Sequence, residues 1–309
     1  MITILMLGGA KRVSVARHIV DAFRRRGRQA RVLSYELDWQ VPAVAVAEVL
    51  PGKRWSDPEL MPARRRIIAE RSVSLVLPFV DPAVEICARL KAECPDVFIP
   101  VSPESVCHAM FDKAEAYRLF AEKGLPQPPL AGDCFPRIYK PRTGSASKGI
   151  FVARRPSDIP EGLDADAYLV QEFVEDAREF TVDCYVRQDG EILSVVPRER
   201  LETAGGEAMR SVTVGDPALI ALSRQVLAAI ELRGPVTLQF LRPTSGEYLL
   251  MEINPRLGGG VVASIGAGSR LPDMLAAETL GLMPEPFGGW VPGTLMARYT
   301  QEIIFAPCK

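Results

Sequence analysis

The sequence predicts an α/β layer in its N-terminal third, followed by segments dominated by β-hairpins. Two observations support this fold class. From residue 1 to about residue 106, short apolar runs alternate with helical patterns, as in parallel βαβ units. After residue 124, β-rich runs are separated by turn residues, as in antiparallel sheets. The 309 residues are enough for two domains, or for a large core with a smaller lid.

The composition is that of an ordinary globular protein, with 48% hydrophobic and 24% charged residues. The net charge of −1 gives no reason to expect nucleic-acid binding, so we expect the arginine runs at 24–26 and 64–66 to be solvated helix faces. No apolar run reaches ~18 residues and no basic region precedes the first strand, so neither a membrane span nor a signal peptide is expected. The six cysteines form no C-x-x-C pair, which favours reduced thiols in a cytoplasmic protein.

In the N-terminal layer, the apolar run Ile2–Leu7 ends at Gly8-Gly9, and a helical pattern then continues to Gly27. Residues 30–37 follow as a second, parallel strand. The glycine turn allows a dinucleotide site. However, the pattern G-x-G-x-x-G is absent, so an ordinary turn between strand and helix is favoured. Further helices are expected over residues 57–71 and 82–93, and further strands over 73–77 and 97–99.

Three acidic residues of this layer leave alternatives open. Glu36 or Asp38 could serve as the ribose-binding acid if the glycine turn held a dinucleotide. Asp81 follows the third strand, at the sheet edge where ligands of open α/β sheets gather. It could equally cap the helix that begins there.

A domain boundary is predicted soon after this layer. Asp112, with Glu115 three residues later, indicates a capping box at the start of a helix that runs to Gly124. The proline-rich segment Leu125–Pro129 then reads as a stiff linker.

The next segment reads as a small hairpin around a loop of small residues. Strands over 137–141 and 150–152 enclose the loop 142–149, whose backbone amides could bind phosphate. The loop is not a Walker motif, and a glycine-rich hairpin loop taken alone is weak evidence. Further on, we expect strands over residues 168–174, 179–186 and 191–196, a mobile loop over 203–207, helices over 217–232 and 271–280, and closing strands over 294–299 and 303–305.

The stretch 247–260 is the strongest candidate for chemistry. Glu252, Asn254 and Arg256 alternate at the end of a strand, so they share a face, with ~6.6–6.8 Å between successive members. The carboxylate and the amide offer oxygens of the kind that Mg²⁺ prefers, and the guanidinium fits phosphate or carboxylate. On these residues alone, an edge hairpin with a charged surface is an equal alternative.

Gln239 belongs to the preceding strand, and its place depends on the length of the loop between the strands. A four-residue loop over 244–247 would put Gln239 opposite Glu252 on the same face. An odd loop would turn it to the other face and remove it from the site.

Taken in order, these pieces resemble the ATP-grasp superfamily, and within it the group similar to the carbamoyl-phosphate synthase large chain and to carboxylate–amine ligases. The matching parts are Tyr139-Lys140-Pro141 with the loop 144–149, the strand 170–174 with Glu179, Gln239, and the stretch 251–260. The resemblance implies an α/β N-terminal domain over 1–110, a small antiparallel lid over 111–175 and a C-terminal α+β domain over 176–309. ATP would bind between the last two.

The resemblance also implies a role for each matching residue. The residues implied to bind ATP are Lys113 and Lys140 at the phosphates, Ser145 and Gly149 in the loop over them, Glu172, Phe173 and Val174 at the adenine edge, and Glu179 at the ribose. Two Mg²⁺ or Mn²⁺ ions would be bound by Gln239, Glu252 and Asn254. Arg256 would act on the transferred phosphoryl group with Lys140, and Arg198 would face the substrate. Either Arg198 or Arg200 would pair with a substrate carboxylate. Gln239 is neutral where many relatives have a carboxylate, which implies a weaker first metal site.

The resemblance implies a cytoplasmic, ATP- and Mg²⁺-dependent ligase of small molecules. It would activate a carboxylate, one that resembles an amino acid, as an acyl phosphate, join it to an amine, and release ADP and phosphate. Dimers are common among relatives, so a homodimer is an open option. Two alternatives remain: an ATP-binding sensor or subunit without turnover, and a small-molecule kinase that stops at the phosphate. A dehydrogenase that uses the Gly8-Gly9 turn is the last alternative.

Overall fold

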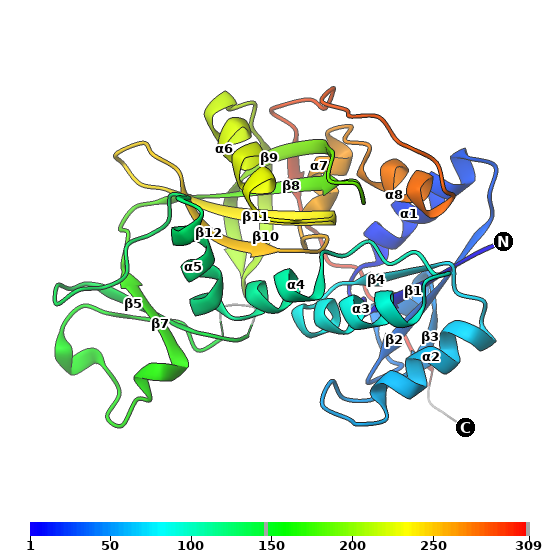
Figure 1. Cartoon of the computed structure of the whole chain (residues 1–309), viewed down its shortest axis with the longest axis horizontal. Helices are drawn as coiled ribbons and strands as arrows, with labels where there is room; N and C mark the ends of the chain where they lie inside the picture. The colour runs from blue at the N-terminus through cyan, green and yellow to red at the C-terminus, as the bar shows by residue number, and fades with distance from the viewer. Residues whose placement is uncertain (145–147, 307–309) are drawn as a thin grey trace.

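The computed structural model describes residues 1–144 and 148–306 as three β-sheets with helices packed around them. A four-stranded sheet lies at the end of the molecule near the N-terminus, and a three-stranded sheet lies at the opposite end (Figure 1). A six-stranded sheet lies between them (Figure 1). Within the described ranges, no helix combines the length and the apolar character that crossing a membrane requires.

The N-terminal sheet is parallel and has the strand order β3-β2-β1-β4. Its strands are β1 (Ile2–Leu7), β2 (Ala30–Glu36), β3 (Glu48–Pro51) and β4 (Leu75–Pro78), and its helices are α1 (Val13–Arg25), α2 (Leu60–Glu70) and α3 (Asp81–Glu93). β1 is central and buried along almost its whole length, as the continuous apolar run predicts. Two details differ from the prediction: β3 is an additional short edge strand, and Phe98 forms an isolated bridge to Leu75 where a strand over 97–99 was expected.

The prediction of a solvated face for residues 64–66 is wrong for Arg64, which is fully buried. Its guanidinium carbon lies 4.2 Å from the ring centre of Tyr35 and 5.1 Å from that of Trp55. The two aromatic faces attract the cation, although burial lowers the pKa of Arg64.

The glycine turn after β1 lies beside a buried carboxylate of the protein itself. The side chain of Glu36 accepts a 2.6 Å hydrogen bond from the Ser34 hydroxyl. Burial raises the pKa of Glu36, whereas Ser34 and the nearby backbone amides of Gly9 and Ala10 lower it. A dinucleotide phosphate at this turn would compete with that carboxylate for the same amides.

Two short helices, α4 (Glu104–Phe111) and α5 (Lys113–Glu122), follow the N-terminal sheet. Of the predicted capping box, the Asp112 half is confirmed, because its side chain accepts hydrogen bonds from the amides of Ala114 and Glu115. The Glu115 side chain does not complete the box and instead pairs with Arg118 at 2.6 Å. α5 packs on the core of the six-stranded sheet, where the Tyr117 hydroxyl donates a 3.0 Å hydrogen bond to the carbonyl of Met251.

The lid is the three-stranded antiparallel sheet β6-β5-β7. Its strands are β5 (Arg137–Pro141), β6 (Phe151–Ala153) and β7 (Tyr168–Glu172). The rings of Tyr139 and Phe151 stack with their centres 4.7 Å apart. Tyr168 packs edge-on against both rings. This aromatic cluster joins all three strands of the small sheet.

The six-stranded sheet is antiparallel and has the order β12-β11-β8-β9-β10-β13. Its strands are β8 (Arg178–Val186), β9 (Ile192–Ala204), β10 (Glu207–Thr213), β11 (Gly234–Arg242), β12 (Leu249–Asn254) and β13 (Leu295–Ala297), and its helices are α6 (Pro217–Ala229), α7 (Val261–Gly266) and α8 (Leu271–Thr279). Alternate residues of β8 serve two cores. Val182 and Cys184 pack with α5 and α6, whereas Tyr185 packs with α1, α7 and α8.

Two further predictions in this part of the chain are wrong. The expected loop over 203–207 is the tip of a long hairpin, in which β9 and β10 are joined by Gly205 and Gly206 with φ of 56° and 78°. Two positive φ values in a two-residue turn match the twist of the strands, and glycine adopts them freely. Residues 303–305 form no strand; instead, the ring of Phe305 packs edge-on against Trp39 at 5.3 Å.

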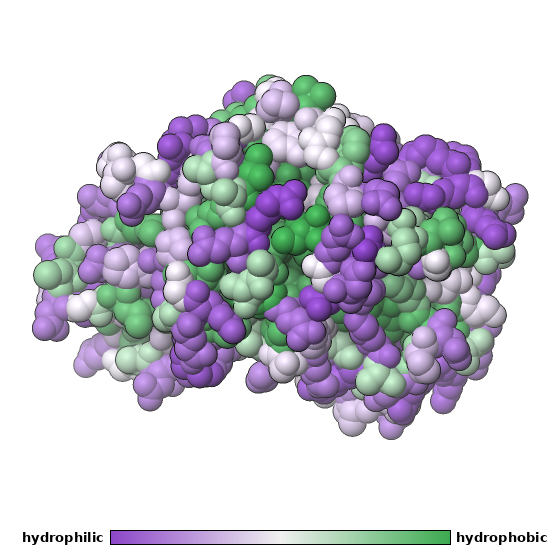
Figure 2. All heavy atoms as spheres, turned by 45° about the horizontal axis from the view of Figure 1, so that its top comes forward, coloured by the Kyte–Doolittle hydropathy of each residue, from purple (hydrophilic) through white to green (hydrophobic). Residues whose placement is uncertain are grey.

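The surface has no single large apolar band on the face shown in Figure 2. Hydrophilic side chains are spread over this whole face, with hydrophobic ones between them and most densely in the middle (Figure 2). Large exposed apolar side chains such as Leu37, Leu130 and Tyr299 belong to separate segments of the chain. Isolated exposed apolar residues of this kind are normal.

Candidate active site

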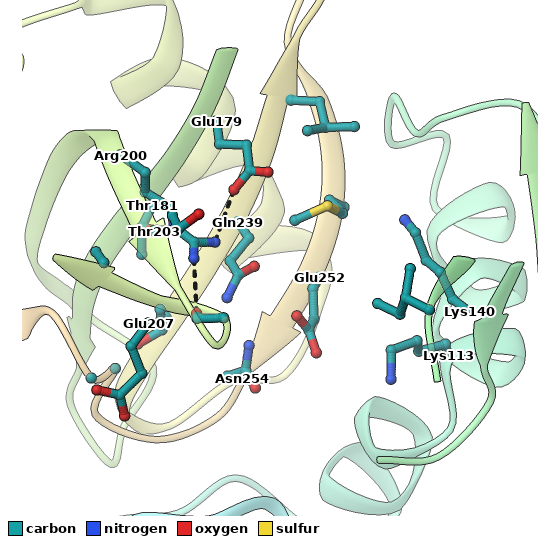
Figure 3. Close-up of a pocket in the computed structure, with 18 of the residues that line it drawn as sticks. Lys113, Lys140, Glu179, Thr181, Arg200, Thr203, Glu207, Gln239, Glu252 and Asn254 are labelled. Carbon is teal, nitrogen blue, oxygen red and sulfur yellow. Dashed lines mark hydrogen bonds and ion pairs between the residues drawn. The ribbon is translucent and has the colours of Figure 1, made fainter. Parts of the chain in front are cut away.

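A cleft of ≈ 630 Å³ lies where the three sheets meet. The N-terminal layer contributes Arg12 and Asp81 to its lining, and the lid contributes Lys140. Lys113 and Lys140 lie on one side of the cleft and face Glu252 and Asn254 on the other (Figure 3). Ser145 lies outside the described residues, and Gly149 does not line the cleft itself but lies between Lys148 and Ile150, which do. Every other residue predicted for the site lines this cleft: Lys113, Lys140, Glu172, Phe173, Val174, Glu179, Arg198, Gln239, Glu252, Asn254 and Arg256.

Gln239 lies directly opposite Glu252, and a β-bulge is the reason. At the hairpin end, Leu241 pairs with Leu249, which leaves an odd number of residues between them. That register alone would turn Gln239 to the other face. However, the pairing skips Met251 between Leu250 and Glu252, and this one-residue bulge restores the parity. The predicted facing pair exists, although it does not arise from the four-residue loop that was considered.

The donor set of Gln239, Glu252 and Asn254 fits a magnesium site that is completed by a ligand. It offers one carboxylate and two amide oxygens from adjacent strands. Within the described ranges, no group of three or more His, Cys, Asp and Glu side chains could hold a metal. Mg²⁺ commonly binds one or two carboxylates, with phosphates and water as the remaining ligands. These residues therefore fit Mg²⁺ bound together with a nucleotide better than Mg²⁺ bound by the protein alone.

Lys140 is buried in the wall of the lid. Its Nζ donates a 2.8 Å hydrogen bond to Oε1 of Gln171, which is itself fully buried. Burial lowers the pKa of Lys140 to about 8, whereas the charges of Glu252 and Glu179 act in the opposite direction. An ammonium group in such a place binds an anion strongly because little water competes for it.

The base of the lid loop is fixed to the start of α5. Arg142 Nη2 lies 2.6 Å from Oδ2 of Asp112, and Lys113 Nζ donates a 3.0 Å hydrogen bond to the carbonyl of Gly144. At the far end, Gly149 has a φ of 75°, and a Cβ there would lie 3.0 Å from Cγ of Pro141. Both ends of the loop are thus placed beside the lysines.

The end of β7 lies at the expected place of the adenine edge. The amides of Glu172 and Phe173 donate to the carbonyls of Pro129 and Pro136 at 3.1 and 3.0 Å. Within the described part of the chain, the amide of Val174 makes no hydrogen bond. This position agrees with the expected place of the adenine edge, which stays a prediction.

Glu179, expected at the ribose, pairs with Arg200 in this structure. Their closest atoms are 3.0 Å apart, and Arg200 also donates a 2.8 Å hydrogen bond to the carbonyl of Gly206 (Figure 3). The Glu179 side chain is 43% exposed, so its second oxygen can reach a ligand. Arg200 connects the predicted ribose position to the β9–β10 hairpin tip.

Arg256 forms an ion pair with Asp81, the acid for which the sequence allows either a place at a ligand site or a helix cap. Arg256 Nε and Nη2 lie 2.8 and 2.6 Å from Oδ1 of Asp81, and Nη2 donates to Oδ1 of Asn254 at 3.0 Å. Asp81 is the first residue of α3 and makes no capping hydrogen bond. The capping alternative is therefore wrong, and Asp81 connects the N-terminal layer to the predicted phosphoryl site.

Arg198 lines the cleft but is largely committed to a buried ion pair. Its Nε donates a 2.8 Å hydrogen bond to Oδ2 of Asp183, which also accepts a 2.6 Å hydrogen bond from Ser264. Arg198 and Asp183 are 2% and 1% exposed. Among the described residues, Arg198 Nη1 has no hydrogen-bond partner. Its expected role toward a substrate stays a prediction, for which only Nε is committed to Asp183.

Sequence reasoning missed Arg12 and Glu207. Arg12 follows the glycine turn, and its Nη2 lies 3.2 Å from the carboxylate of Glu207 at the start of β10. Arg298 shares this carboxylate at 3.3 Å. No pattern in the sequence relates these residues, because 195 positions separate Arg12 from Glu207.

The chain is similar to one protein family over part of its length and to several solved structures over most of it. Residues 164–301 match the family model described as "ATP-grasp in the biosynthetic pathway with Ter operon". No curated protein matches the chain.

Solved structures match nearly the whole chain. Biotin carboxylase from Campylobacter jejuni superposes with a TM-score of 0.74 and 17% identity, over 94% of this chain and 73% of that chain. N5-carboxyaminoimidazole ribonucleotide synthetase from Thermotoga maritima gives 0.66 and 18%, over 93% and 78%. The L-amino acid ligase from Bacillus licheniformis gives 0.68 and 17%, over 89% and 73%. At these identities, the similarity concerns the fold.

Proposed function

Because the chain has the ATP-grasp fold, we propose that it is an ATP- and Mg²⁺-dependent ligase that joins a small carboxylate to an amine. One observation carries the proposal. Two lysines of the lid side face an acid and two amides across a single cleft, which Arg256 also lines. These side chains are the charges and oxygens that phosphoryl transfer from a magnesium nucleotide requires. A similar fold has been solved with MgADP and bicarbonate, in the biotin carboxylase domain from Hydrogenobacter thermophilus.

The reaction would take place in two displacements. A carboxylate oxygen of the substrate attacks the γ-phosphorus of ATP, the bond to the β-phosphate oxygen breaks, and ADP leaves. The amine nitrogen then attacks the carbonyl carbon of the acyl phosphate, loses a proton, and expels inorganic phosphate. Neither step needs a protein nucleophile, since positioning and charge neutralisation supply most of the catalysis.

Residues of the cleft would divide this work. Lys113 and Lys140 would bind the phosphates, and Arg256, oriented by Asp81, would stabilise the charge on the transferred group. Gln239, Glu252 and Asn254 would hold one or two Mg²⁺ ions, which neutralise phosphate charge and keep the reacting oxygens in line.

The lid loop would protect the acyl phosphate from water. The described start of the loop is fixed by Arg142 to Asp112 and by Lys113 to Gly144, which keeps it beside the lysines that would bind the phosphates. Exclusion of water suppresses hydrolysis of the reactive intermediate and strengthens each charge interaction inside the site.

Product analysis tests the proposal directly. Purified protein is incubated with ATP, Mg²⁺ and pooled small acids and amines, with and without hydroxylamine. We expect ADP together with a hydroxamate, since hydroxylamine captures an acyl phosphate. Glu252→Gln should lose this activity because it removes the one carboxylate of the metal set. Arg25→Gln, on the outer surface of α1, should keep it.

The other outcomes separate the alternatives. AMP with pyrophosphate would overturn the acyl-phosphate route. ADP without hydroxamate would identify a small-molecule kinase, and bound ATP without turnover would favour a sensor or subunit. The homodimer, the cytoplasmic location and the domain boundaries at 110 and 175 stay predictions; light scattering tests the first.

A further inference from the structure

We infer that Arg12 and Arg198 form a binding site for a second carboxylate of the substrate, so that the acid activated in this cleft is a small dicarboxylate. We call these two residues the arginine corner. The inference rests on the proposed function, because it assigns the acid that the ligase would activate. It gives a role to Arg12, which is neither one of the residues predicted to bind ATP nor one of those predicted to bind Mg²⁺.

The first support is the glycine run next to the two guanidinium groups. A Cβ on Gly259 would lie 3.0 Å from Nη1 of Arg12, and a Cβ on Gly260 would lie 2.7 Å from Nη1 of Arg198. Neither glycine has a positive φ, so the backbone conformation does not call for glycine at either position. Glycine is needed at both positions because a side chain would take the space of the two guanidinium groups. Consecutive Cα atoms are ~3.8 Å apart, so both arginines lie against the same turn of the chain.

The second support is an unsatisfied donor. Arg198 lines the cleft and is almost fully buried, and its Nη1, a buried atom, has no hydrogen-bond partner among the described residues. Leaving such a donor unpaired is unfavourable. Arg12, with 15% of its side chain exposed, uses Nη2 for Glu207 and also lines the cleft. A carboxylate between them would satisfy the buried donor and accept from Arg12 as well.

The third support is the place of the corner in the cleft. Glu207, the partner of Arg12, lies on the side away from Lys113 and Lys140, with Asn254 and Glu252 between (Figure 3). An acid whose reacting carboxylate lies at the metal set would extend from there to the arginine corner. Burial and the neighbouring cations Arg256 and Arg298 all lower the pKa of Arg12. A bound anion would relieve that repulsion.

The test compares acids of equal chain length. Succinate is paired with butyrate, and glutarate with pentanoate, in two measurements: ADP release with the hydroxylamine trap, and the midpoint of thermal unfolding with MgADP present. The variants are Arg12→Gln, Arg12→Lys and the control Arg25→Gln. Arg25 also pairs an acid of the C-terminal part, Asp273 at 2.9 Å, but on the outside of the molecule.

We expect the dicarboxylates to give ADP and to raise the unfolding midpoint in the wild type and in Arg25→Gln, and the monocarboxylates to do neither. Arg12→Gln should raise the dicarboxylate concentration for half-maximal response about tenfold or more, with the ATP requirement unchanged. Arg12→Lys keeps the charge without the fork, so its response should be intermediate. Its unfolding midpoint without acid also shows whether position 12 tolerates substitution.

Each remaining outcome decides one proposal. If dicarboxylates raise the unfolding midpoint without any ADP release, the binding site at the arginine corner is supported and the proposed ligase activity is contradicted. Hydroxamates formed equally from mono- and dicarboxylates, or an Arg12→Gln response equal to that of Arg25→Gln, would overturn the corner and leave the ligase standing. Absence of any response to these acids in both measurements would also overturn the corner.

Discussion

Lys140 on β5 donates a 2.8 Å hydrogen bond to Gln171 on β7, and both side chains are buried in the wall of the lid. The amide oxygen is neutral, so it orients the ammonium group without neutralising it. The lid therefore presents a partly dehydrated cation to the cleft, and burial lowers the pKa of Lys140 to about 8. A phosphate group would reverse that effect, because a nearby negative charge favours the protonated amine.

The first prediction concerns the pH dependence of nucleotide binding. Below pH 8 the free protein already carries the charged lysine, so affinity for MgATP should be level there. As pH rises through 8, binding must take up a proton, and affinity should fall by up to about tenfold per pH unit until the raised pKa of the complex is reached. Calorimetry between pH 7 and 9.5 in buffers of different ionisation enthalpy measures both the affinity and the proton uptake.

Two variants make this assignment specific to Lys140. Lys140→Met should bind MgATP weakly, with no proton uptake at pH 9. Gln171→Met removes the acceptor of the ammonium group, so the decline in affinity should begin at a lower pH than in the wild type. A decline in Lys140→Met as steep as in the wild type would assign the titration to another group.

The sequence predicts which segments build the site but not how they meet. The alternation at Glu252, Asn254 and Arg256 is a local property of one strand, and the structure keeps it. The facing of Gln239 and Glu252 depends on a bulge at Met251, which no residue type announces. Bulges arise from the packing of both strands against their neighbours, and a single-strand pattern contains no such information.

The long-range ion pairs of the site cannot be predicted from the sequence for a different reason. Asp81 and Arg256 are 175 positions apart, and Arg12 and Glu207 are 195 apart. Each lies in a segment whose local pattern has an ordinary explanation, a helix start, a glycine turn or a loop tip. Similarly, the sequence permits Glu36 as a ribose-binding acid, whereas in the structure its buried side chain accepts a hydrogen bond from Ser34. Only tertiary structure distinguishes these roles.

The second prediction concerns metal affinity at Gln239. Gln239→Glu adds a carboxylate directly opposite Glu252, and affinity for divalent cations rises with the charge of the ligands. The Mg²⁺ concentration for half-maximal MgATP binding should fall by about threefold to tenfold. Without metal, the two facing carboxylates repel each other, so the unfolding free energy should drop by about 0.2–1 kcal/mol. Gln239→Leu is the control and should weaken Mg²⁺ binding; an unchanged requirement in both variants would remove Gln239 from the metal set.

The third prediction distinguishes the roles of Arg256 and Asp81, which form an ion pair between the C-terminal part and the N-terminal layer. Arg256→Ala removes the cation itself, so turnover should fall by about 10²–10³-fold with little change in MgATP affinity. Asp81→Asn keeps Arg256 but withdraws the carboxylate that holds it at 2.6 and 2.8 Å. We expect a smaller loss, about tenfold, and again in kcat. If Asp81→Asn matched Arg256→Ala, Asp81 would need a role of its own in the reaction, and steady-state kinetics on both variants decides this.

The last prediction concerns the space that Gly260 leaves for Arg198. A Cβ at Gly260 would come within 2.7 Å of Nη1 and 2.8 Å of Cζ of Arg198, whose guanidinium is fixed by Asp183. Because that buried ion pair cannot move aside freely, Gly260→Ala should cost about 1–3 kcal/mol of unfolding free energy. Gly266, at the end of the same helix, has no atom within 4 Å of its Cβ position, so Gly266→Ala is the matched control. It should be neutral or stabilising by up to about 1 kcal/mol, because alanine favours the helix. Urea unfolding of both variants measures the difference, and equal stabilities would mean that Arg198 has room to move.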